Sequence, residues 1–223
     1  MPHTSETGAG NLHWATALLS ELAAHGVTYV CLSPGSRCTP LTVAAARNET
    51  IETLVHYDER GAAFHALGYA RATGRPAVLI STSGTAVANY LPAVVEASVG
   101  HVPLLVITSD RPPELRQTGA NQTIDQVRIF GTYTRWYFEL PCPTSDIDVD
   151  MVRSTAAQAV YRSAGTPAGP VHLNCLFREP FLPEDAGLPA VAAGPKTTYY
   201  PPVRSPAPEA LDALEGLIAD STS

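Results

Sequence analysis

The chain has 223 residues, of which 45% are hydrophobic and only 16% are charged, so a domain with a well-buried core is expected and disorder is not. Its formal net charge of −7 argues against nucleic acid as the main partner. The sequence has no signal-peptide pattern, no membrane-length apolar run and no C-x-x-C spacing, which together predict a reduced, cytoplasmic protein.

Strand-like and helical segments alternate along most of the chain. After a flexible terminus expected over residues 1–10, the spacing of apolar residues predicts helices over 11–25, 39–47, 62–73, 86–99 and 151–163. Strands are predicted over 27–32, 53–57, 77–81, 104–109, 134–140 and 169–176. This alternation is typical of an α/β domain, here over 11–182, with a doubly wound, mainly parallel sheet flanked by helices.

The composition changes near residue 179. Frequent prolines predict an extended linker over 183–207. Residues 208–219 resume a helical pattern with Leu211, Leu214, Leu217 and Ile218 on one stripe. Because a lone amphipathic helix cannot bury its apolar face, we expect 208–223 to be the truncated start of a central domain, and the chain to be an N-terminal fragment of a longer protein.

Polar residues follow four of the predicted strands. Ligands of parallel α/β sheets bind outside the carboxyl ends of the strands, so these segments predict a single site. The run Ser-Pro-Gly-Ser-Arg at 33–37 offers Arg37, a side chain suited to a bidentate grip on a carboxylate, although a solvated arginine in a tight turn is equally compatible. The run Thr-Ser-Gly-Thr at 82–85 suits an anion or a packed ring, or is simply a capped turn.

Glu59 lies where a strand is predicted to end and a helix to begin. An acid there is placed for chemistry, but it could equally stabilise the helix dipole by about 0.3–1 kcal/mol. His56 and Asp58 share a strand face, yet two potential ligands without a third make a metal site weak.

A long polar segment covers residues 110–126. Its guanidinium and carboxamide groups, among them Arg111, Asn121 and Gln122, suit acids that carry several oxygens. No G-x-G-x-x-G follows a strand and no G-x-x-x-x-G-K-[ST] occurs, so a nicotinamide, flavin or nucleoside triphosphate site is not expected.

Taken together, the runs at 33–41, 56–60, 82–89 and 110–126 resemble the 2-succinyl-5-enolpyruvyl-6-hydroxy-3-cyclohexene-1-carboxylate synthases, thiamine-diphosphate enzymes of menaquinone and phylloquinone biosynthesis. The resemblance extends over residues 11–182. It implies the pyrimidine-binding domain of a three-domain transferase that decarboxylates 2-oxoglutarate and adds the resulting succinyl carbanion equivalent to isochorismate by 1,4-addition.

The resemblance also implies roles for individual residues. Glu59 would be catalytic, with its carboxyl group against the aminopyrimidine ring of the cofactor, where it promotes a proton relay through that ring. Substrate contacts are implied for Ser36, Arg37, Arg111, Asn121 and Gln122. Cofactor contacts are implied for Glu59, Pro34, Gly35, Thr82, Ser83, Gly84 and Asn89. Cys38 stands where the family commonly has another small residue.

In the same family, Mg²⁺ or Mn²⁺ and the diphosphate are held by a Gly-Asp motif of the C-terminal domain. No Gly-Asp dipeptide occurs in these 223 residues, so we expect no metal ligand here and an inactive fragment. The resemblance implies a homodimer or homotetramer of the full-length protein. The alternatives are another thiamine-diphosphate enzyme of the acetolactate synthase or 2-oxo-acid decarboxylase type, a non-catalytic assembly module, and an anion-binding module at the Thr82 turn.

Overall fold

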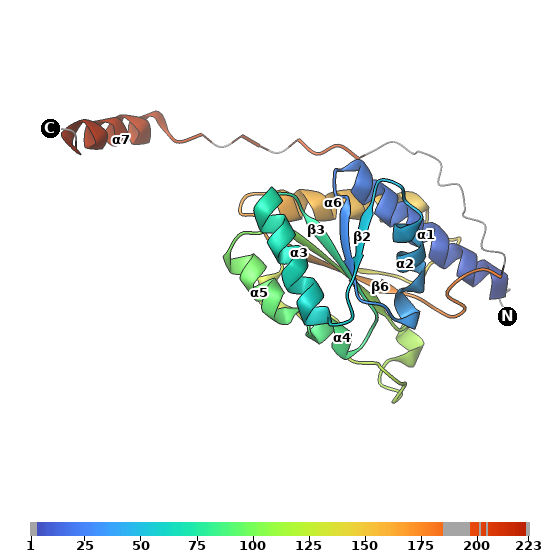
Figure 1. Cartoon of the computed structure of the whole chain (residues 1–223). Helices are drawn as coiled ribbons and strands as arrows, with labels where there is room; N and C mark the ends of the chain where they lie inside the picture. Colours follow the sequence, from blue (N-terminus) through green and yellow to red (C-terminus); the bar gives the residue numbers. More distant parts are fainter. Residues whose placement is uncertain (1–3, 185–196, 201, 204, 222–223) are drawn as a thin grey trace.

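The computed structural model describes residues 4–184, 197–200, 202–203 and 205–221. In this part of the chain a fully parallel six-stranded sheet has the strand order β2-β1-β3-β4-β6-β5 (Figure 1). The strands are β1 (Tyr29–Leu32), β2 (Glu52–Val55), β3 (Ala77–Ser81), β4 (Leu104–Asp110), β5 (Trp136–Leu140) and β6 (Pro170–Leu176). The predicted sheet and all six of its strands are therefore confirmed, with ends shifted by up to two residues.

Helices cover both faces of the sheet, which explains why its central strands are buried along their whole length and mostly apolar. One face packs on α1 (Thr4–Ala24), α2 (Thr39–Ala46) and α6 (Val149–Ala164), and the other on α3 (Glu59–Thr73) and α5 (Leu91–Val99). Along β1, Val30 and Leu32 enter the first core, whereas Tyr29 and Cys31 enter the second. This alternation is the two-residue period of a strand.

Two helices differ from the prediction. The first helix begins at Thr4, so residues 4–10 lie in α1 and not in an irregular terminus. This early start is held by the chain near residue 180, because Asn11 Nδ2 donates to the carbonyl groups of Arg178 (2.8 Å) and Pro180 (3.0 Å).

The helix predicted over 86–99 is divided into α4 (Thr85–Ala88) and α5. Pro92 explains the division, because it lacks the N–H that would bond to the preceding turn. Asn89 thereby lies at the junction of the two helices.

The C-terminal part leaves the α/β domain. Of the predicted linker, residues 185–196, 201 and 204 lie outside the described residues. Thr197 N donates to Glu21 Oε1 (3.3 Å) and Tyr199 stacks on Tyr161, so these residues contact the domain. The predicted last helix is confirmed as α7 (Pro208–Ser221); it lies apart from the domain with all its residues exposed (Figure 1). Within the described residues, no helix is long and apolar enough to cross a membrane.

Candidate active site

The predicted site residues gather at the carboxyl edge of the sheet. β2 pairs with one side of β1 and β3 with the other, so the order of the strands reverses between β1 and β3. Open parallel sheets bind their ligands outside such a reversal point. The loops that follow β1 and β3 are in direct contact there, because a Cβ added to Gly35 would overlap the side chain of Thr82.

Glu59 is the first residue of α3 and is partly exposed. Asn89 Nδ2 donates to Glu59 Oε2 at 3.0 Å, and among the described residues Oε1 has no hydrogen-bond partner. The junction between α4 and α5 therefore orients one carboxylate oxygen and leaves the other available. Both readings of Glu59 stay compatible with the structure, since a residue at a helix start can also stabilise the dipole.

Tyr90 lies close to this carboxylate in the core. Its hydroxyl donates to the carbonyl of Ile80 at 2.9 Å. Burial raises the pKa of Tyr90, and the negative charge of Glu59 acts in the same direction. The hydroxyl groups of Ser33 and Ser81, which follow β1 and end β3, are buried beside the Tyr90 hydroxyl and act on its pKa in the opposite direction, lowering it.

His56 and Asp58 have local structural roles. Asp58 caps α3 by accepting a hydrogen bond from Gly61 N at 2.7 Å. His56 Nδ1 accepts from Asp58 N at 3.1 Å. No group of three potential metal ligands occurs in the described part of the chain.

Arg37 is not a solvated turn residue. It is only 5% exposed, and its guanidinium donates to the carbonyl of Phe177 (2.7 Å) and to Glu179 Oε1 (2.8 Å). The same group lies over the Phe181 ring at 4.8 Å, while Nε has no partner. Glu179 was not among the predicted site residues; only its place directly after the last strand could have suggested it.

Arg111 connects the loop after β4 with the turn after β3. Its Nη1 donates to Ser83 Oγ and to the carbonyl of Gln122 (2.7 Å), and Gln122 Nε2 donates to the carbonyl of Ser83 (3.3 Å). Burial lowers the pKa of Arg111, and the charge of Arg37 lowers it further. The two guanidiniums are thus close enough to repel each other, as expected of a site for an anionic ligand.

Not every predicted residue joins these contacts. Ser36 and Asn121 are exposed, and their carbonyl groups accept bonds from Thr39 Oγ1 (2.7 Å) and Thr123 Oγ1 (3.2 Å). Their side chains make no hydrogen bond with any described residue. Pro34 is exposed as well. These three residues lie at the rim of the strand ends.

A hydrogen bond to a buried side chain holds the turn at 82–85 in place. Gly84 has a positive φ of 83°, and its N–H donates to Gln126 Oε1 at 2.9 Å. Because this N–H is used and α4 has only four residues, the turn is poorly suited to hold an anion by itself. The structure therefore disfavours the anion-binding alternative.

A buried polar network behind this turn escaped the sequence analysis. Its members come from β4, β5, β6 and the segment that follows β4: Thr108, Asp110, Arg116, Gln126, Glu139, His172 and Asn174. The available signal was the presence of threonine, histidine and asparagine inside otherwise apolar strand runs. Burial raises the pKa of Asp110 and lowers that of His172 to about 3.

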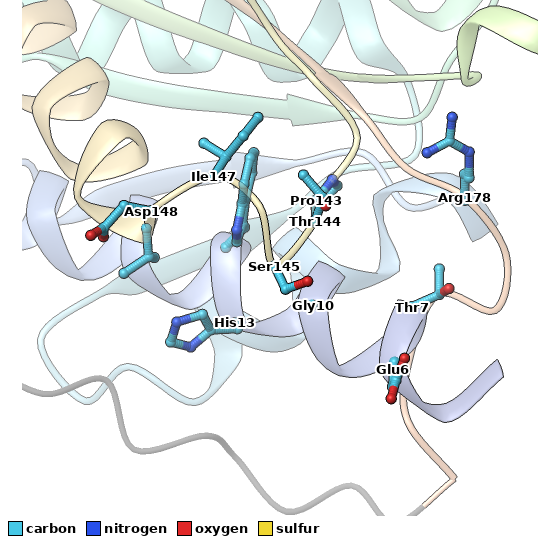
Figure 2. A pocket seen from close by; sticks show the side chains of 12 residues that line it. Glu6, Thr7, Gly10, His13, Pro143, Thr144, Ser145, Ile147, Asp148 and Arg178 are labelled. Carbon is cyan, nitrogen blue, oxygen red and sulfur yellow. The ribbon is translucent and has the colours of Figure 1, made fainter. Parts of the chain in front are cut away.

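A cavity of about 830 Å³ lies elsewhere, between the start of α1 and the segment before α6 (Figure 2). None of the predicted site residues lines it. Its charged groups have both signs, with Asp148 and Arg178 at opposite sides of the view. Arg178 is already paired with both oxygens of Glu114, at 2.5 and 3.0 Å.

Known proteins resemble this chain closely. A family described as thiamine pyrophosphate enzyme, N-terminal TPP binding domain, matches residues 12–129. A 2-succinyl-5-enolpyruvyl-6-hydroxy-3-cyclohexene-1-carboxylate synthase from Rubrobacter xylanophilus is 58% identical over 198 residues, which are 86% of this chain and 34% of that protein. A synthase of the same name from Salinibacter ruber is 52% identical, and the match covers 90% of this chain and 36% of that protein. Another from Chlorobium phaeobacteroides is 58% identical, and the match covers 79% of this chain and 30% of that protein. The chain thus spans about a third of the length of the curated relatives it matches.

Proposed function

This chain belongs to the thiamine pyrophosphate enzymes through their N-terminal TPP-binding domain, and from that premise we propose that it is the pyrimidine-binding part of a 2-succinyl-5-enolpyruvyl-6-hydroxy-3-cyclohexene-1-carboxylate synthase. The proposed substrates are 2-oxoglutarate and isochorismate, and the reaction is a decarboxylation followed by 1,4-addition. The observation that carries the proposal is the Glu59 carboxylate, fixed through Oε2 and free at Oε1, at the carboxyl edge of a parallel sheet.

The residues present fit an aminopyrimidine ring. Such a ring needs a carboxyl partner and a flat, dry contact surface. Glu59 Oε1 supplies the partner. The contact of Gly35 with Thr82 supplies a closely packed surface.

When bound, thiamine diphosphate supplies the nucleophilic carbon that attacks a 2-oxo acid and stores the electrons released with carbon dioxide. This chain would contribute proton control at one atom. Glu59 would exchange a proton with a ring nitrogen at Oε1, and the bond from Asn89 to Oε2 would keep the carboxyl group in position. The loops after β1 and β3, with Gly35, Thr82 and Ser83, would orient the ring.

Arg37 and Arg111 are the proposed partners of the substrate carboxylates. Their guanidiniums are planar forks, each held by a protein carbonyl group, and their Nη atoms carry further N–H groups for a ligand. Gln122, Asn121 and Ser36 would add hydrogen bonds from the rim. Glu179 would have to share Arg37 with a substrate, because its carboxylate already binds that side chain.

The remaining parts of the active enzyme are proposed to lie outside this chain. We infer that a second domain begins near residue 208, that Mg²⁺ or Mn²⁺ and the diphosphate are held by a C-terminal domain, and that two subunits complete each site. The exposed apolar stripe of α7, with Leu211, Leu214, Leu217 and Ile218 between 45% and 68% exposed, supports further polypeptide packing there.

The full-length enzyme allows a direct test. We expect product formation from isochorismate with 2-oxoglutarate and none from pyruvate alone. Turnover of pyruvate to acetolactate or acetaldehyde, with no reaction of isochorismate, would contradict the proposal and favour an acetolactate synthase or decarboxylase. Cofactor binding without any turnover would favour a non-catalytic module.

A further inference from the structure

One side chain, Gln126, connects the buried polar network to the turn at 82–85. Gln126 is 1% exposed, and both of its polar atoms make hydrogen bonds. Nε2 donates to the carbonyl of Ser109 (3.1 Å) and to Asn174 Oδ1 (2.9 Å), while Oε1 accepts from Gly84 N (2.9 Å). One amide therefore joins β4, β6 and the turn after β3.

Behind Gln126 the network continues into the sheet. Thr108 Oγ1 donates to Asn174 Oδ1 (2.8 Å), so it must accept from His172 Nε2, also at 2.8 Å. Thr108, His172 and Asn174 are all completely buried. Buried polar groups cost free energy unless they are paired, and the two acceptors of Gln126 Nε2, Asn174 Oδ1 and the Ser109 carbonyl, fix the orientation of the Gln126 amide.

In front of Gln126 lie the residues of the proposed site. A Cβ at Gly84 would lie 2.9 Å from Gln122 Cγ, so the turn and the loop after β4 touch directly. Arg111 donates to Ser83 Oγ and to the carbonyl of Gln122. Ser83 directly precedes Gly84, and Gln122 is the residue that Gly84 touches. If the bond from Gly84 to Gln126 were lost, the turn that carries Ser83, the partner of Arg111 and Gln122, would lose a hydrogen bond that ties it to β4 and β6.

We propose that Gln126 is a positioning residue that transmits the rigidity of β4 and β6 to Ser83, Arg111 and Gln122. It does not touch the reactants. The role deepens the proposed function and rests on it, because these three residues matter for catalysis only if they contact cofactor or substrate.

Two variants of the full-length enzyme separate positioning from simple stability. Gln126→Met and Thr108→Val each replace a buried polar side chain of the network by an apolar one of similar volume, and both should lower the Tm by several degrees. Only Gln126→Met loses the bond to Gly84. We expect it to raise the Kd for thiamine diphosphate or the KM for isochorismate at least tenfold, whereas Thr108→Val stays within about twofold of wild type.

A third variant covers the case in which Gln126→Met does not fold. Gln126→Glu keeps the acceptor for Gly84, and in its protonated form it can still donate to Asn174; ionised, it repels Asn174 Oδ1 and the Ser109 carbonyl. Burial favours the protonated form. The ratio of its Kd or KM to that of wild type should therefore shrink as the pH is lowered from 8 to 6.

The outcomes are distinct. The positioning role would be overturned if Gln126→Met and Thr108→Val changed the Kd or KM equally. It would also be overturned if the ratio of the Gln126→Glu Kd or KM to that of wild type did not change with pH. A wild-type enzyme that neither binds thiamine diphosphate nor turns over isochorismate would overturn the proposed function instead.

Discussion

His172 is a titratable group held entirely inside the protein. Its Nε2 bonds to Thr108, its ring meets the edge of Phe130 at 4.8 Å, and Tyr137 lies 5.2 Å away. Burial lowers its pKa from 6.5 to about 3. The unfolded chain therefore binds a proton on this residue between about pH 6.5 and pH 3, and the folded chain does not, so stability is complete above this window and falls as the pH decreases through it.

We predict that His172→Gln reduces this pH dependence, because its amide can still donate to Thr108 but does not titrate. Between pH 7.5 and pH 5.5, wild type should lose about 1.4 kcal/mol more unfolding free energy than the variant, the equivalent of one pKa unit. Urea denaturation at the two pH values measures the difference. Equal losses of unfolding free energy in both proteins would show that His172 is protonated in the folded protein.

The hydrogen-bond partners of site residues could not be predicted where the partner is distant in sequence. Arg37 was predicted as a candidate because of its place after a strand, but its partner Glu179 is 142 residues away. In the same way, the spacing of residues 56–60 could not reveal that Asn89 orients Glu59, because their contact depends on the break between α4 and α5. The motifs gave the type of chemistry, and only the fold gave the contacts.

At the scale of elements, strands were easier to predict than helix ends. The strand runs are apolar and bounded by turn residues, so β3 was predicted to the residue. The helix over 86–99 was predicted as continuous from its apolar spacing alone, whereas Pro92 lies at the start of a separate helix, α5. The start of α1 depends on Asn11 bonding to residues near 180, a long-range contact that no local pattern contains.

The contact between the loops after β1 and β3 yields a second prediction. Gly35→Ala should destabilise the domain by about 1–3 kcal/mol, the usual cost of overpacking, because the new methyl group would overlap the short, branched side chain of Thr82. Gly68→Ala is the matched control. Gly68 is exposed in the middle of α3 with no atom within 4 Å of an added Cβ, so alanine there should stabilise the helix by up to about 1 kcal/mol.

Chemical denaturation of both variants provides the measurement. Equal stability changes for Gly35→Ala and Gly68→Ala would mean that the two loops do not meet as described, and the proposed surface for the aminopyrimidine ring would lose its support.

At the scale of the whole molecule, the two ends of the chain differ in character. The α/β domain has two complete cores, one on each face of the sheet. α7 instead exposes its leucines, which is compatible with the proposed start of a second domain. We propose the same for the candidate site, which a second polypeptide surface would complete by excluding water from it.

The proposal that this edge activates thiamine diphosphate can be measured before any substrate is added. In the full-length enzyme, the exchange of the thiazolium C2 proton for deuterium can be followed by NMR for wild type, Glu59→Gln and Glu49→Gln, the last altering an exposed acid in the turn before β2. Glu59→Gln should slow the exchange by about 10²-fold or more, because an amide cannot supply the carboxyl proton, and should leave the Tm unchanged. Glu49→Gln should match wild type, whereas equal exchange rates in all three proteins would contradict the role of Glu59.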